Sequence, residues 1–138
     1  MRKLQSQQGV MMIEALLGIL IFSLGILAML GMQVTGMRAT IDAKYRAEAS
    51  FLANRIVGVI WADAANINNY ATASCAGNTL CNAWLTEVQA KLPNATGANA
   101  PTIVVNGRQV TVTILWQRPG ETTTSNHSVI AQIYRKSD

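Results

Sequence analysis

The sequence predicts an α+β protein in which a long N-terminal helix packs on a small antiparallel sheet of about three strands. An unbroken apolar run covers residues 10–32, where Glu14 and Ser23 carry the only polar side chains. Helical spacing of apolar residues continues from this run to about residue 65. Alternation typical of strands takes over after Pro101. A helix followed by a series of strands is typical of the α+β class.

The apolar run is long enough to be a membrane anchor. As a helix, residues 10–32 would span about 35 Å, and a bilayer core is about 30 Å thick. A cleaved secretion signal usually has an apolar region of roughly 7–15 residues, and this run is longer. We therefore expect a retained transmembrane and assembly helix over residues 10–33, preceded by a short polar segment, residues 1–9.

The orientation of the anchor follows from charge and from cysteine content. Arg2 and Lys3 favour a cytoplasmic start of the chain, because positive residues tend to stay on the cytoplasmic side of a membrane. Arg38, Lys44 and Arg46 follow the other end of the run and weaken this signal. The two cysteines favour an exported C-terminal part, since disulfides form in oxidising compartments.

Glu14 is the costly residue of the apolar run. An acid at the centre of a bilayer costs about 2.5–3.5 kcal/mol on insertion scales, and less near an interface. One interpretation is a carboxylic acid that stays protonated near the lipid headgroups. The other is a charge-assisted contact with an N-terminal amine of a neighbouring subunit, an amine that a cut between Gly9 and Val10 would create. The residues themselves leave both interpretations open.

The amphipathic half of the same helix is predicted over residues 34–65. Its core-facing side chains are Leu52, Ile56, Val59 and Ile60. Residues 66–138 then form a globular head. The segment from Ala64 to Ala83, which leads from the helix into this head, is predicted as a loop because it is rich in Asn, Ala, Thr and Ser. This loop contains Cys75 and Cys81, for which a disulfide is the expected state after export.

A short helix and three strands complete the predicted head. Trp84 to Leu92 has helical spacing, and Pro93 ends it. Asn106-Gly107 predicts a two-residue hairpin turn between a first strand and the alternating strand Val110 to Trp116. A third strand is expected over His127 to Arg135. The tryptophans, which are expected to be core or interface anchors, are Trp61, Trp84 and Trp116.

Composition and motifs argue against several classes of function. The formal net charge of +4 is scattered, which does not favour nucleic-acid binding. No glycine-rich phosphate loop, nucleophile elbow or paired-carboxylate site occurs, so we expect no enzyme, no catalytic residue, no cofactor and no small-molecule substrate. Two cysteines and one histidine do not complete a metal site. His127 is expected to be an ordinary surface side chain.

The junction from Gly9 to Leu17 resembles the class III leader junction of type IV pilins and pseudopilins. In that family a basic leader ends in Gly, an apolar residue begins the mature chain and Glu is its fifth residue. Gly9, Val10 and Glu14 match this pattern. The stretches Leu24 to Leu27 and Leu30 to Gln33, with residues continuing to Arg55, are similar to the V-type (PilV-like) minor pilins. Val10 and Met11 differ from the usual Phe and Thr or Ser.

The resemblance implies a pilin-like fold and a function in assembly. A prepilin peptidase would remove the leader, residues 1–9, and methylate the new amine of Val10, and Glu14 would contact a neighbouring subunit. The implied partners are the peptidase, other minor pilins, the major pilin and the inner membrane. The head would be periplasmic before the subunit enters a filament on the cell surface, where minor pilins help to start assembly near the tip.

Two other functions stay open from the sequence. A minor pseudopilin of a type II secretion system shares the same anchor, so physical reasoning does not separate it from a pilus subunit. A membrane-tethered binding or adhesion module, with no role in assembly, would not need Glu14.

Overall fold

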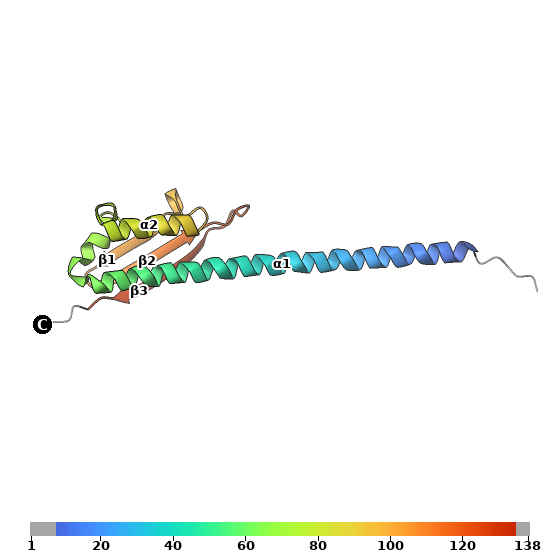
Figure 1. Ribbon diagram of the computed structural model, residues 1–138, viewed down its shortest axis with the longest axis horizontal. Coiled ribbons are helices and arrows are strands. Elements are labelled where there is room, and N and C mark those ends of the chain that lie inside the picture. Colours follow the sequence, from blue (N-terminus) through green and yellow to red (C-terminus); the bar gives the residue numbers. More distant parts are fainter. Residues whose placement is uncertain (1–7, 135–138) are drawn as a thin grey trace, which may run out of the picture. The chain divides into compact units, whose positions relative to one another are not determined.

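The computed structural model describes residues 8–134, and Figure 1 traces their helices and strands. Contacts divide the chain into two compact units, Met1–Asp42 and Ala43–Asp138. The long helix α1, Gln8–Ala62, contributes to both units. It ends slightly before the predicted residue 65, because the chain tightens there into a 3-10 helix, η1, Ala64–Tyr70.

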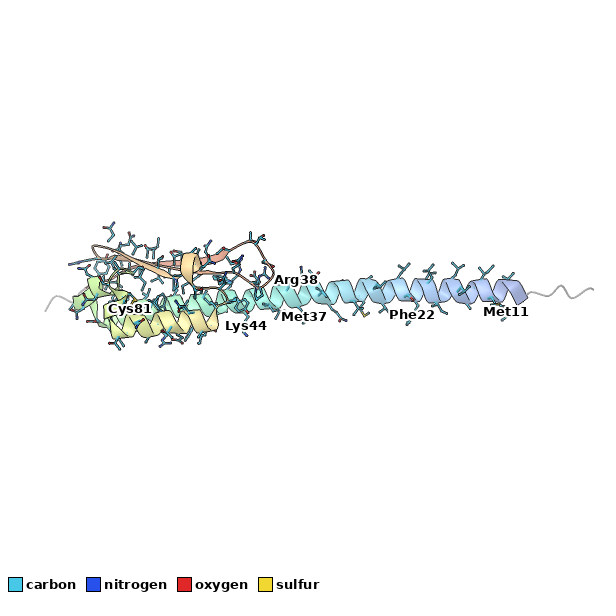
Figure 2. The ribbon with its side chains drawn as sticks, turned by 90° about the horizontal axis from the view of Figure 1, so that it is seen from above. Met11, Phe22, Met37, Arg38, Lys44 and Cys81 are labelled. Carbon is cyan, nitrogen blue, oxygen red and sulfur yellow. A yellow bond between two sulfur atoms is a disulfide. The ribbon has the colours of Figure 1, made fainter. Side chains whose placement is uncertain are left out.

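In the first unit α1 has no tertiary core of its own. Every residue from Val10 to Ile41 is exposed, and the side chains of Met11, Phe22 and Met37 project away from the helix axis (Figure 2). The hydroxyls in this stretch are satisfied within the helix. Ser23 Oγ donates to the carbonyl oxygen of Ile19 at 2.7 Å, and two threonines make the same bond one turn back. These hydroxyl groups therefore have a hydrogen-bond partner within the helix and do not need one from the surroundings.

The second unit is a two-layer α+β head, which confirms the predicted fold class. Its sheet contains β1, Thr102–Asn106, β2, Gln109–Trp116, and β3, Ser125–Gln132, in the order β1-β2-β3 with antiparallel neighbours. The end of α1 and a second helix, α2, Thr79–Lys91, lie on one face of this sheet (Figure 1).

The core of the head lies between these two layers. From α1 it takes Ala49, Leu52, Ala53, Ile56 and Ile60, and from β2 it takes Val110, Val112, Ile114 and Trp116. The alternation predicted for β2 is confirmed, because these four side chains are buried and the residues between them are half-buried. Of the predicted core positions on α1, only Val59 is incompletely buried.

The start of α2 differs from the prediction. The helix begins at Thr79, inside the segment that we expected to be a loop, and a short 3-10 helix, η2, Cys75–Gly77, precedes it. Asn78 is the N-cap, and its side-chain oxygen accepts from the backbone N–H groups of Leu80 and Cys81. This satisfies donors that a helix leaves free at its first turn. The predicted end before Pro93 is correct.

The hairpin between β1 and β2 is shifted by one residue from the prediction. Asn106 pairs with Gln109, so the two connecting residues are Gly107 and Arg108. Gly107 has a φ of 60° and lies at the first turn position, where a type II′ turn requires positive φ. The third strand is also displaced, since β3 begins at Ser125 and ends at Gln132 instead of reaching Arg135.

The three tryptophans have different environments. Trp84 and Trp116 are buried, as predicted. The indole N–H of Trp84 donates to the carbonyl oxygen of Leu52 at 2.9 Å and so joins α2 to the C-terminal part of α1. Trp61 is 47% exposed and is therefore not part of the core.

Candidate functional site

Gly9, Val10 and Glu14 all lie in the first turns of α1. Val10 and Glu14 are four residues apart, which places them on the same side of the helix. Both are exposed, and within residues 8–134 the Glu14 carboxylate makes no hydrogen bond or ion pair. The geometry therefore leaves this acid available to a group outside the described part of the chain. Residues 1–7 of the predicted leader, residues 1–9, lie outside the described residues.

Further along the anchor the helix surface is hollowed. Small side chains leave a shallow, open depression there, lined by Ala28, Gly31, Met32, Thr35, Gly36 and Ala39. At Gly31 and Gly36, a methyl group in place of the hydrogen would meet no neighbouring atom within 4 Å. The fold of this chain therefore does not itself require glycine at these two positions. Small residues on apolar helices allow close approach of another helix.

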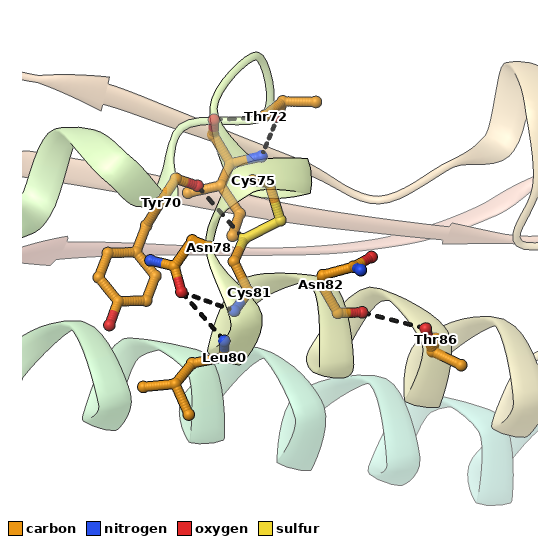
Figure 3. The surroundings of a disulfide bond; sticks show 9 residues. Tyr70, Thr72, Cys75, Asn78, Leu80, Cys81, Asn82 and Thr86 are labelled. Atoms are coloured by element: carbon orange, nitrogen blue, oxygen red, sulfur yellow. Dashed lines mark hydrogen bonds between the residues drawn. A yellow bond between two sulfur atoms is a disulfide. The ribbon is translucent and has the colours of Figure 1, made fainter.

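The predicted disulfide between Cys75 and Cys81 is present, which confirms that part of the sequence interpretation. Figure 3 shows that it joins η2 to the first turn of α2, beside Tyr70 and Asn78. The two Cα atoms are 5.2 Å apart, a usual distance for a disulfide. Both cysteines are buried. The bond thus fixes a short polar segment onto the core and exposes no reactive thiol.

Tyr70 supports the same corner of the head. Its hydroxyl donates to the Asp63 carboxylate at 2.9 Å, which ties the end of α1 to η1. Burial, helped by the negative charge of Asp63, raises the pKa of the Tyr70 hydroxyl. The phenol therefore stays protonated and keeps donating this bond well into the alkaline range.

A cluster of charges joins α1 to α2, and the sequence analysis did not predict it. Lys91 lies 2.8 Å from Glu48 and 3.3 Å from Glu87, and Arg55 pairs with the other oxygen of Glu87. The hydrogen bond that the Lys91 ammonium donates to the Glu48 carboxylate is the main cause that raises the pKa of Lys91. The Lys91 ammonium also lies over the ring of Phe51 at 5.6 Å. These ion pairs join α1 to α2.

His127 differs from the surface side chain that we expected. It lies on the helix-facing side of β3, opposite Ile114, and is half-buried with its Nε2 atom enclosed. Among residues 8–134, no group of three His, Cys, Asp or Glu side chains gathers as a metal site.

Comparison with known proteins finds no match, whether the chain is tested against protein-family models, characterised proteins or solved structures. By length and composition α1 is able to cross a membrane, a property that some core helices and secretion signals share. Its apolar part is fully exposed and so is not the core helix of this head. The site that most needs a partner is therefore the apolar half of α1.

Proposed function

We propose that this chain is a minor subunit of a type IV pilus that acts in the initiation of assembly. Prepilin peptidase cuts it between Gly9 and Val10 and methylates the new amine. Residues 10–33 then hold it in the inner membrane with the head in the periplasm, until it joins other minor pilins and the major pilin at or near the filament tip. The observation that carries the proposal is the fully exposed apolar stretch of α1 from Val10 to Met32, which has a single acid, Glu14, one turn after the proposed cut.

The physical argument concerns what a new N-terminus at Val10 does to the helix. A helix start presents four unpaired N–H groups and the positive end of its dipole. The cut adds an ammonium group at the same place. In an apolar environment these positive groups need a nearby anion, and Glu14 is the only acid in residues 10–32. Stacked subunits meet this need when the Glu14 of one helix contacts the terminus of the next.

The cleavage step is tested by replacing Gly9 with Trp, with Gly9→Ala as the conservative control. We expect the Trp variant to stay uncleaved in the inner membrane and pili to be lost, because a bulky side chain blocks the peptidase. The Ala variant should be processed. Mass spectrometry of the membrane protein and electron microscopy of the cells measure both results. Normal piliation with an intact leader would contradict the proposal.

The assembly contact is tested by Glu14→Ala, with Ser23→Ala as the matched change elsewhere in the anchor. Ser23 bonds only within its own helix, so its loss should leave assembly intact. Loss of Glu14 should reduce incorporation into filaments while the protein remains in the membrane. A tethered binding module without an assembly role predicts instead that both variants behave as the parent does.

Deletion of the gene distinguishes a pilus subunit from a secretion pseudopilin. Loss of twitching motility and surface pili, with normal export of secreted proteins, is the expected result. Loss of protein secretion with normal pili would assign the chain to a type II secretion system.

A further inference from the structure

The two edges of the sheet differ, and the difference points to a second interaction surface. In a two-residue hairpin the closing pair exchanges both backbone hydrogen bonds. Asn106 and Gln109 form this pair. The backbone N–H and C=O groups of the even-numbered residues of β1 therefore bond to β2, and those of its odd-numbered residues point to the outer edge of the sheet. The backbone groups of the even-numbered residues of β2 then point toward β3. The N–H of Ile133, which donates to the carbonyl of Arg108 at 2.8 Å, fits this register.

The outer edge of β1 is covered by the chain itself. The backbone N–H and C=O groups of Ile103 point to this edge, and both are hydrogen-bonded to Thr72. The Thr72 N–H donates to the Ile103 carbonyl at 2.9 Å, and the Ile103 N–H donates to the Thr72 hydroxyl oxygen at 2.7 Å. Pro101, which has no N–H, precedes the strand. Among residues 8–134, the only outward backbone groups of β1 left without a partner are those of Val105, which are too few to pair with another strand.

Among residues 8–134, the outer edge of β3 carries none of these protections. Its odd-numbered residues face β2, so the backbone groups of Asn126, Ser128, Ile130 and Gln132 point away from the sheet. Between Ser125 and Gln132 the strand has no proline and no Lys, Arg, Asp or Glu. Natural proteins protect long edges with such residues, or cover them, because an open edge pairs with other chains.

The core layer is also incomplete beside β3. On β2 every helix-facing side chain is fully buried, but the helix-facing residues of β3, which include Val129 and Ala131, are only half-buried. On α1, Val57 and Trp61 lie about 200° round the helix from Arg55 and Glu48, which contact α2. They therefore lie on the flank of α1 away from α2, where an added strand would place its apolar side chains.

We propose that the open edge of β3 binds an antiparallel β-strand of a different polypeptide. That strand has apolar residues at alternating positions facing α1 and an apolar residue opposite Ile130. The second requirement comes from the outer face of the sheet. There Val104, Thr111 and Ile130 form one row across the three strands, and Val104 and Ile130 are 57% and 64% exposed. An apolar neighbour continues this row.

A second copy of this chain fits the edge less well. Two β3 strands that pair around a two-fold axis must match even-numbered residues with even-numbered residues. In the two registers that use nearly the whole strand, Ile130 faces either Ser128 or Asn126, which are polar. The register that matches Ile130 with itself leaves Asn126 unpaired. Cross-strand neighbours determine sheet pairing, so a foreign strand is the better partner.

The inference goes beyond the proposed function and does not depend on cleavage or on the anchor. The test uses the full chain in detergent micelles and a fluorescent eight-residue peptide as the probe. The peptide alternates valine with threonine, except that isoleucine replaces one central threonine. Fluorescence anisotropy measures binding, and we expect it to be saturable.

Two chemically matched peptides test whether binding uses strand pairing. N-methylation of the threonine-side residues removes the N–H groups that would face β3 and should abolish binding. N-methylation of the valine-side residues leaves those groups intact and should preserve binding. Equal binding of both methylated peptides, or no binding of the unmodified peptide, would overturn the proposal. This comparison needs only the unaltered protein.

A pair of variants locates the binding edge. Ile130→Pro removes an outward N–H from β3 and should weaken binding at least about tenfold. Val105→Pro makes the same change at an outward position of the covered edge and should leave affinity within about twofold. Circular dichroism checks that both variants stay folded. If sedimentation shows a dimer of the unaltered chain that Ile130→Pro separates, the partner is a second copy and the foreign-strand assignment is wrong.

Discussion

Apolar side chains are used in opposite ways in two parts of the molecule. One part is the exposed stretch of α1, residues 10–41, which contains the anchor, and the other is the head formed by the second unit, described to residue 134. In the anchor every apolar side chain up to Ile41 faces outward, and at the glycines there is empty space. In the head the helix-facing apolar side chains of β2 are completely buried. Burial in the head is therefore explained by the chain's own fold, whereas the apolar character of the anchor is explained only by what surrounds it.

The sharpest test of this comparison changes the same residue in both regions. Ile114 is fully buried and Ile21 is 68% exposed. Ile114→Ala should lower the free energy of unfolding of the head by about 3–4 kcal/mol, because it leaves a cavity in a packed core. Ile21→Ala should change it by less than about 0.5 kcal/mol. Denaturant unfolding in detergent, followed by tryptophan fluorescence, measures both. Equal effects would show that the anchor is part of the folded core.

The disulfide gives the next largest effect, and it is confined to the head. Replacing Cys75 and Cys81 together with alanine should destabilise the head by about 2 kcal/mol, since a short loop loses its covalent constraint. Helicity of the anchor should not change. Circular dichroism during reduction separates the two regions. If reduction leaves the unfolding midpoint unchanged, the bond does not contribute to stability.

A smaller effect is expected at the N-cap of α2. Asn78→Ala removes the acceptor for two backbone N–H groups and should cost about 1 kcal/mol. Asn78→Gly should cost less, because glycine is tolerated at this position. Thermal unfolding of the two variants gives the comparison, and an equal loss in both would assign the effect to something other than the cap.

Alkaline pH should produce the smallest and most local change. The folded head raises the pKa values of Tyr70 and Lys91, so it holds these protons more tightly than the unfolded chain does. Their stabilisation is complete below pH values near 10 and is lost as pH rises through the raised pKa values. Unfolding at pH 9 and above, compared with Tyr70→Phe, measures it. The variant should show the weaker pH dependence, and an identical dependence would contradict the role of Tyr70.

The sequence predicted the elements with strong periodicity and was less accurate where a single side chain decides the structure. The long helix, the alternation on β2 and the disulfide follow from spacing and composition. The start of α2 was not predicted because asparagine is common in loops, and only the structure shows that the Asn78 side chain caps a helix. The hairpin was displaced because Asn106 and Gly107 both suit a turn, and pairing selected Gly107 and Arg108.

Tertiary contacts account for what the sequence could not predict at the candidate sites. Thr72 covers β1 from a distant loop, and no local pattern indicates this contact. The charged cluster around Lys91 likewise depends on how α2 lies along α1. The cleavage junction and Glu14 remain predictions from sequence, because they lie on a helix that makes no tertiary contacts of its own in the first unit.

The contact between Thr72 and Ile103 limits how far the sheet can grow. A sheet with two open edges can add a strand at each of them and so can extend without end, as amyloid fibrils do. Because Thr72 covers the edge of β1, this head can add a strand only at the edge of β3. Binding a single foreign strand would saturate it, so the head would act as a terminator in any chain of strand exchanges and not as a repeating link.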